Sequence, residues 1–342
     1  MRATAIAFLA LLRPCDAMRL TALAFLALLR PCAPSGADHI LREGTLQPGA
    51  VAAPPRLVFV HIPRAAGGSS MNAAPSVLPK GTTLLGSAES AAWSRLTRER
   101  KGDGGGLVTM LRFPLSLALS QFLYCKFQLR RRKGRGRFPN RDPGRPRAPT
   151  AGLDEWAAHF PANTSYGCYD PTNVQYRFVA GNGNARGAGG VAARMTIDKA
   201  VKFLDDEFYF VGLVELHAES LCALAHATTG RVPAHCGCGV DAPARRATHG
   251  KIRKLQNVTA ASLAPAQRDA LARITAKDLV LYARALLSFE RRVADVRART
   301  GVALVCDGKL DALWATTLEY ACAGAAAHAT RRVLHGSDRR CS

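Results

Sequence analysis

The residues with the clearest chemical potential lie in two segments that pass from a strand into a loop. The first is Leu57-Val-Phe-Val-His-Ile-Pro-Arg-Ala-Ala-Gly-Gly-Ser-Ser70, in which an apolar run meets proline, arginine, two glycines and two serines. That order predicts a buried strand, a tight loop and the start of a helix. Such a loop directs backbone N–H groups and the helix dipole at one point, so it predicts a phosphate site. The Gly-x4-Gly-Lys-Ser/Thr spacing of a Walker A loop is absent.

The second segment repeats this order of strand, basic residue, proline and helix. It reads Leu107-Val-Thr-Met-Leu-Arg-Phe-Pro-Leu-Ser-Leu-Ala-Leu-Ser-Gln-Phe-Leu-Tyr124. Pro114 suits the first turn of a helix, and the apolar residues after it recur at helical spacing. Arg112 and Ser120 offer a guanidinium fork and a hydroxyl, which together suit a phosphate monoester. Taken alone, the segment also fits a core strand that ends in a solvated arginine.

Both segments resemble motifs of the Golgi carbohydrate sulfotransferases, a family that includes the heparan sulfate 2-O- and 6-O-sulfotransferases. The family's 5′-phosphosulfate loop reads roughly His-Ile-Pro-Lys-Thr-Ala-Gly-Thr-Ser, and its 3′-phosphate motif resembles Met-Leu-Arg-Asp-Pro followed by a helix with a serine. This chain departs from the family at three positions: Arg64 replaces lysine, Gly68 replaces threonine and Phe113 replaces aspartate.

Three later segments are similar to family motifs in the same order. They are Asn173-Val-Gln-Tyr-Arg-Phe-Val-Ala-Gly181, the strand and helix within residues 200–224, and Lys277-Asp-Leu-Val-Leu-Tyr-Ala-Arg-Ala-Leu-Leu-Ser-Phe-Glu290. The resemblance therefore covers about residues 56–297. Because each motif is short, their shared order carries most of the specificity.

The resemblance implies transfer of a sulfuryl group from 3′-phosphoadenosine 5′-phosphosulfate (PAPS) to a hydroxyl of a glycan, with no metal. Arg64 would be the catalytic cation at the bridging oxygen, and Arg112 and Ser120 would hold the 3′-phosphate. The full set of residues expected to bind the donor is Arg64, Ala65, Ala66, Gly67, Gly68, Ser69, Ser70, Arg112 and Ser120.

The acceptor hydroxyl also needs a base, which relatives place after the first loop as histidine or glutamate. No histidine occurs between Ser70 and Gly106, where the glutamates are Glu89 and Glu99. Glu89 follows an expected strand at residues 82–85, so we expect Glu89 to be the base. A solvated surface glutamate is the alternative for either residue.

Alternating strands and helices predict an α/β fold with a mainly parallel sheet and ligands at the carboxyl ends of its strands. The resemblance refines this to a P-loop-like three-layer sandwich, the PAPS-dependent sulfotransferase fold. We expect a signal segment at 1–37, a linker at 38–55, the sulfotransferase domain at 56–300 with a basic insertion at 126–150, and a cysteine-containing tail at 301–342.

Charge and composition fit a globular chain that meets acidic partners. The 342 residues are 48% hydrophobic and carry a net charge of +22, with ten basic residues against one acidic residue between Lys126 and Arg147. Clustered positive charge steers polyanions, although a solvated loop without a partner is the alternative. No nucleic-acid module accompanies the charge, so we expect an acidic polysaccharide acceptor and no specific nucleic acid.

The N-terminus and the cysteines predict the secretory pathway. Residues 1–15 and 18–32 are near repeats, each with a basic start and an apolar run of roughly nine or ten residues, the length of a signal-peptide core. The segment is either a cleaved signal peptide or a type II anchor that attaches the protein to the Golgi membrane. Eight of the ten cysteines follow it, an even number that predicts disulfides. His235-Cys-Gly-Cys238 suggests zinc as an alternative, but no second pair at ligand spacing follows.

Overall fold

The structure is a computed structural model, and it describes residues 56–86, 105–131, 152–159, 170–180, 195–240 and 259–341. Contacts divide the chain into Met1–Thr45 and Leu46–Ser342, and all described residues belong to the second unit. The signal segment, the linker, Glu89 and Glu99 lie outside the described residues, as does most of the basic insertion.

The described strands form one four-stranded parallel sheet. They are β1 (Arg56–Val60), β2 (Thr83–Gly86), β3 (Gly106–Leu111) and β4 (Phe208–Leu213), in the order β2-β1-β3-β4. β1 and β3 are central, and nearly every residue in them is buried. Continuous apolar runs of this kind are typical of parallel strands covered on both faces. The prediction of an α/β domain with a mainly parallel sheet is confirmed.

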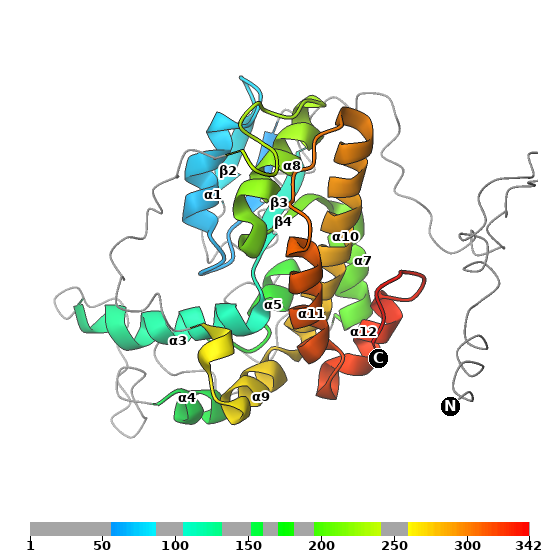
Figure 1. Cartoon of the computed structure of the whole chain (residues 1–342). Coiled ribbons are helices and arrows are strands. Elements are labelled where there is room, and N and C mark those ends of the chain that lie inside the picture. The colour runs from blue at the N-terminus through cyan, green and yellow to red at the C-terminus, as the bar shows by residue number, and fades with distance from the viewer. Residues whose placement is uncertain are drawn as a thin grey trace, which may run out of the picture. The chain divides into compact units, whose positions relative to one another are not determined.

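Helices flank this sheet. They are α1 (Gly67–Ala73), α3 (Pro114–Arg131), α4 (Leu153–His159), α5 (Val174–Val179), α7 (Ile197–Glu207), α8 (His217–Thr229), α9 (Pro265–Ile274), α10 (Ala276–Thr300), α11 (Lys309–Ala321) and α12 (Ala327–Val333). In Figure 1, α1 lies to the left of the strands and α7 and α10 lie to their right, while α3 extends from the sheet toward α4 and α9.

Sequence signals set several of these boundaries. Pro114 is the first residue of α3, as expected, because proline lacks the N–H that a first helical turn leaves unpaired. Pro75 lies in the 3-10 turn Ala74–Ser76 that follows α1, so the helix stays short. Thr196 caps α7 by accepting a hydrogen bond from the backbone N–H of Lys199, and Gly301 ends α10 in the left-handed conformation.

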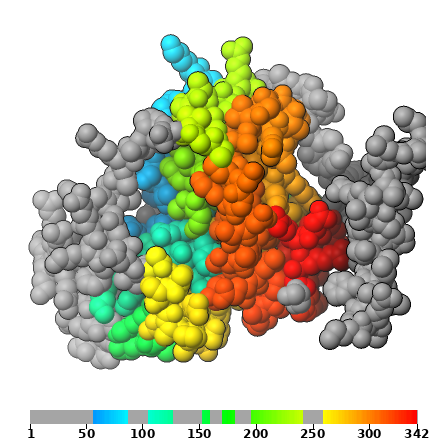
Figure 2. Space-filling model, in the orientation of Figure 1, coloured from blue at the N-terminus to red at the C-terminus, as the bar shows by residue number. Residues whose placement is uncertain are grey.

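The C-terminal residues form helices, whereas the sequence predicted only a tail with cysteines. Figure 2 shows α11 and α12, in orange and red, across the visible face of the molecule. In α11 the buried residues Trp314, Thr317 and Ala321 recur at helical spacing. Arg339 fixes the end of the chain, because its guanidinium contacts Glu290 at 2.6 Å and stacks over Trp314.

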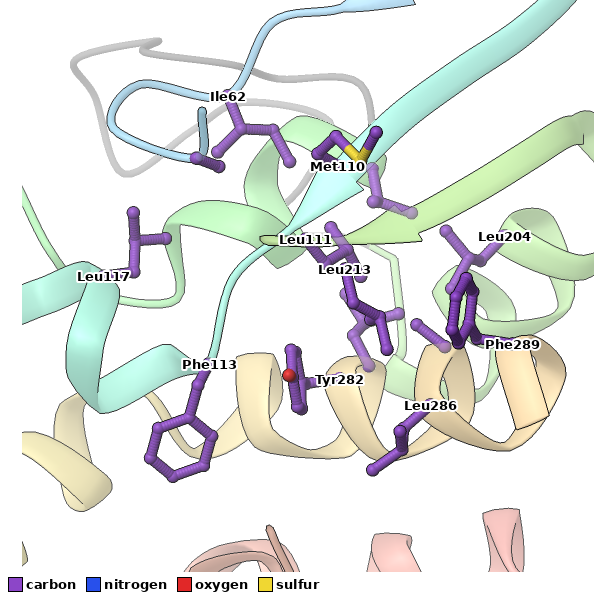
Figure 3. Packing of buried hydrophobic residues seen from close by; sticks show 14 of the residues in the cluster. Ile62, Met110, Leu111, Phe113, Leu117, Leu204, Leu213, Tyr282, Leu286 and Phe289 are labelled. Carbon is purple, nitrogen blue, oxygen red and sulfur yellow. The ribbon is translucent and has the colours of Figure 1, made fainter. Parts of the chain in front are cut away.

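The core packs the carboxyl ends of the strands against the first half of α10. Figure 3 shows Leu111 and Leu213, from neighbouring strands, on the side of α10 that carries Tyr282 and Phe289. All four side chains are almost completely buried. This packing fixes the position of α10 relative to the carboxyl ends of β3 and β4. The candidate site lies at these strand ends.

Three disulfides close loops in the described residues. They are Cys222–Cys236, Cys238–Cys306 and Cys322–Cys341, and Cys125 is disulfide-bonded as well. These bonds indicate an oxidising, extracytoplasmic environment. Among the described residues, no helix combines the length and the apolar character needed to cross a membrane.

The disulfides should differ in how much they stabilise the fold. Cys238–Cys306 closes a separation of 68 residues and Cys322–Cys341 one of 19 residues. Because a longer closed loop restricts the unfolded chain more, replacing the first pair by serine should cost about 4 kcal/mol and the second about 3 kcal/mol. Denaturant unfolding of the two double variants measures the order. A larger loss from the shorter loop would contradict the prediction.

Candidate functional site

The two predicted phosphate segments meet at one edge of the sheet. β1 and β3 are paired neighbours that run in the same direction, with Phe59 opposite Val108. The loop after β1 and the residues after β3 therefore emerge side by side at the carboxyl edge. In parallel α/β sheets this edge is where ligands bind.

The loop after β1 is held in an unusual backbone conformation. Arg64 has φ 69° and Ala66 has φ 56°, both in the left-handed region that non-glycine residues rarely adopt. Each such residue costs on the order of 1–3 kcal/mol, which the surrounding structure must offset, and such residues concentrate at functional sites. At position 67 a Cβ would lie 1.9 Å from the His61 ring, so any residue other than glycine would force that ring to move.

Arg64, Arg112 and Ser120 come together in space. The Arg112 guanidinium donates a hydrogen bond to the backbone carbonyl of Arg64 at 3.1 Å. The Arg64 Nε donates to Ser120 Oγ at 3.4 Å, and its guanidinium carbon lies 4.9 Å from the centre of the Tyr124 ring. Two cations and a hydroxyl, predicted from segments 48 and 56 residues apart, thus form one cluster.

The other loop residues differ in exposure. Gly68 is exposed and Ser69 is half-buried, so their backbones face solvent more than those of Ala65 and Gly67, which are buried. Ser70 is buried, and its hydroxyl lies 3.0 Å from His217 Nε2 at the start of α8. Sequence analysis gave His217 no role. Only its place within the family-like segment at residues 200–224 marked it.

The peptide at the end of β3 is clamped on both sides. The Gln175 side chain accepts a hydrogen bond from the backbone N–H of Arg112 and donates one to its carbonyl, both at 2.8 Å. Glu215 accepts the backbone N–H of Phe113 at 2.8 Å and the hydroxyl hydrogen of Tyr282 at 2.8 Å. The later family-like segments thus supply the groups that fix Arg112, a role that sequence analysis did not assign to them.

Burial and nearby charges shape the electrostatics of the cluster. Desolvation lowers the pKa of the Arg112 guanidinium, Glu215 opposes this by raising it, and Arg64 lowers it further. Desolvation raises the pKa of Glu215, although the hydrogen bonds from Phe113 and Tyr282 favour its ionised form. The residue Glu215 is solvent-exposed overall, whereas its carboxylate group is surrounded by protein atoms. Two cationic side chains, Arg64 and Arg112, therefore lie next to each other and suit an anionic ligand.

A buried carboxyl group supports the clamp from α10. Asp278 accepts the backbone N–H groups of Gln175 at 3.2 Å and Tyr176 at 2.7 Å, at the start of α5. Desolvation, the largest effect, raises the pKa of Asp278 to about 7. Asp278 therefore fixes α5, α5 fixes Gln175, and Gln175 fixes Arg112.

The zinc site suggested by His235-Cys-Gly-Cys238 conflicts with a disulfide. Among the described residues, Cys222, His235 and Cys236 bring their donor atoms within 4.8 Å of one another. Cys222 and Cys236 are bonded to each other, so neither sulfur is a thiolate that could bind a metal. Sequence analysis missed Cys222 as the third member of this group, because it lies on α8.

The structure thus joins Arg64, Arg112 and Ser120, buries the Ser70 hydroxyl, and leaves Glu89 outside the described residues. A scan against protein-family models and searches of curated proteins and of solved structures found no match for this chain.

The strained loop predicts that glycine is stabilising at position 66. Ala66 has φ 56°, where glycine is free of the steric penalty of a Cβ, so Ala66→Gly should raise the free energy of unfolding by about 0.5–1 kcal/mol. Thermal unfolding measures this effect. The control is Ala312→Gly on the exposed face of α11, which should destabilise the fold by a similar amount. Equal losses from both variants would contradict a left-handed residue at position 66.

The raised pKa of Asp278 predicts that the free energy of unfolding depends on pH. Its pKa is about 7 in the folded chain, above the value of about 3.9 for an unfolded aspartate. Because the folded state holds the proton more tightly, the stability from this group is complete below about pH 4 and is lost as the pH rises toward about 7. The Asp278→Asn variant serves as the reference, because asparagine has no carboxyl group to titrate at this position. Urea unfolding of both proteins should show their stability difference falling across this window, by at most about 1.4 kcal/mol per pH unit. A constant difference would contradict the assignment.

Proposed function

We propose that this protein is a PAPS-dependent carbohydrate O-sulfotransferase of the Golgi lumen. The observation that carries the proposal is the cluster at the carboxyl edge of β1 and β3. There the Arg112 guanidinium bonds the Arg64 carbonyl, and the Arg64 guanidinium reaches Ser120. The order of the family-like motifs along the chain supports the same conclusion, as does the all-parallel sheet.

A nucleotide with phosphate groups at two positions suits this cluster. The Arg64 guanidinium and the backbone from Gly67 to Ser69 would hold the 5′-phosphosulfate, and Arg112 with Ser120 would hold the 3′-phosphate. Ser70 would act through its contact with His217, which ties the start of α1 to α8. The finer fold that we propose is the three-layer PAPS-dependent sulfotransferase fold.

The reaction passes the sulfuryl group in line from the donor to an acceptor hydroxyl. A new S–O bond forms to the acceptor, the bond from sulfur to the bridging oxygen breaks, and 3′-phosphoadenosine 5′-phosphate leaves. Negative charge gathers on that oxygen, so a fixed cation such as Arg64 acts mainly in the transition state. A guanidinium does not give up a proton, so Arg64 stabilises charge and does not serve as an acid. Glu89 remains our proposed base for the acceptor proton.

The net charge of the chain and its oxidising compartment suggest the class of acceptor. A net charge of +22 attracts acidic polymers, and the disulfides fit a lumen where glycans are modified. We therefore propose an acidic polysaccharide as the acceptor, and attachment to the membrane where the N-terminal segment is retained.

A second candidate is a catalytically inactive member of the same fold that binds acidic glycans. The departures from the family's motifs favour it, namely Arg64 for lysine, Gly68 for threonine and Phe113 for aspartate. Incubating the full chain with labelled PAPS and a panel of glycans separates the two candidates. Transfer of label supports the enzyme, whereas donor binding without transfer to any glycan favours the inactive protein.

Donor binding itself has a direct test. Arg112→Ala should weaken binding of 3′-phosphoadenosine 5′-phosphate by about tenfold to a hundredfold, because a charged hydrogen bond contributes roughly 1.5–3 kcal/mol. Calorimetric titration of the full chain measures the affinity. The control is Arg299→Ala, which removes an exposed arginine from the last turn of α10 and should leave affinity unchanged. Equal affinity of Arg112→Ala and wild type would overturn the proposal.

A further inference from the structure

Two side chains of α3 contact the same guanidinium. Ser120 and Tyr124 are one helical turn apart, so they lie on the same face of α3. Ser120 Oγ accepts a hydrogen bond from Arg64 Nε at 3.4 Å, and the Tyr124 ring lies beneath the guanidinium carbon at 4.9 Å from its centre. One contact is a hydrogen bond from the guanidinium Nε–H, and the other is a cation–π contact with the ring.

Arginine suits this pair of contacts better than lysine does. A guanidinium is planar, so it stacks on an aromatic face while its Nε–H points along the plane toward a hydroxyl. An ammonium is a compact, strongly hydrated charge without a face or an edge. We infer that Tyr124 is a positioning residue that makes this site specific for arginine at position 64. This inference rests on the proposed role of Arg64 as the cation beside the transferred group.

The ring is well placed to act in this way. Tyr124 is half-buried on α3, and α3 begins at Pro114, directly after the clamped Arg112–Phe113 peptide. The helix therefore fixes the ring relative to Arg112. Stacking restricts the long Arg64 side chain before any ligand arrives, which lowers the conformational entropy lost on binding.

Binding of 3′-phosphoadenosine 5′-phosphate to variants of the full chain tests the inference. Tyr124→Phe keeps the ring and should bind within about twofold of wild type, whereas Tyr124→Leu should bind about 3- to 30-fold more weakly. Arg64→Lys should weaken binding in the wild-type background and add little in the Tyr124→Leu background, because the stack is already lost. Additive losses in the double variant, or equal affinities of the Phe and Leu variants, would overturn the inference. The control is Tyr209→Leu, near the opposite end of β4.

A measurement without ligand separates this inference from the proposed function. The Nε–H proton of Arg64, identified by its loss in Arg64→Lys, should resonate upfield in the NMR spectrum because it lies near the Tyr124 ring. The shift should persist in Tyr124→Phe and vanish in Tyr124→Leu. An unshifted resonance in the wild type overturns the inference whether or not the nucleotide binds, and this result needs no variant of Tyr124. A shifted resonance without nucleotide binding leaves the arginine contact standing and overturns the proposed function.

Discussion

The clamp on the peptide between Arg112 and Phe113 is the constraint on which the rest of the site depends. A strand that ends in an arginine would normally release that side chain to solvent. Here the Gln175 amide satisfies both backbone groups of Arg112, and Glu215 satisfies the N–H of Phe113. A polar group left unpaired in a buried setting costs about 1–3 kcal/mol, so these hydrogen bonds fix the peptide in a single position. The Arg112 guanidinium then reaches back to the Arg64 carbonyl and ties the two loops together.

α10 is the element that stabilises the clamp from below. Asp278 holds the start of α5, and Tyr282, one turn later, donates its hydroxyl hydrogen to Glu215. Both side chains are completely buried, and the hydrophobic contacts of α10 with the strand ends keep them in place. Two adjacent arginines repel each other, so their proximity needs a rigid frame. An anion bound beside both guanidinium groups would relieve this repulsion.

The elements that depend on local sequence were predictable, and the contacts between distant segments were not. The apolar runs of β1 and β3 and the proline at position 114 each act within a few residues, and the structure confirms the strands and the helix that they predict. His217 meets Ser70 across 147 residues and Glu215 meets Phe113 across 102, and no local pattern encodes such pairs. The order of family-like motifs did mark the segments that hold these residues. The helices after Thr300 were missed because their small buried residues, such as Thr317 and Ala321, make a weak hydrophobic pattern.

The central claim is that Arg64 and Arg112 grip opposite ends of one bisphosphate nucleotide. A crystal structure of the protein with 3′-phosphoadenosine 5′-phosphate would test it most directly. We expect the 5′-phosphate against the loop of Arg64 and the 3′-phosphate against Arg112 and Ser120, with the clamp unchanged. A nucleotide that bound elsewhere, or that touched only one of the two arginines, would contradict the account.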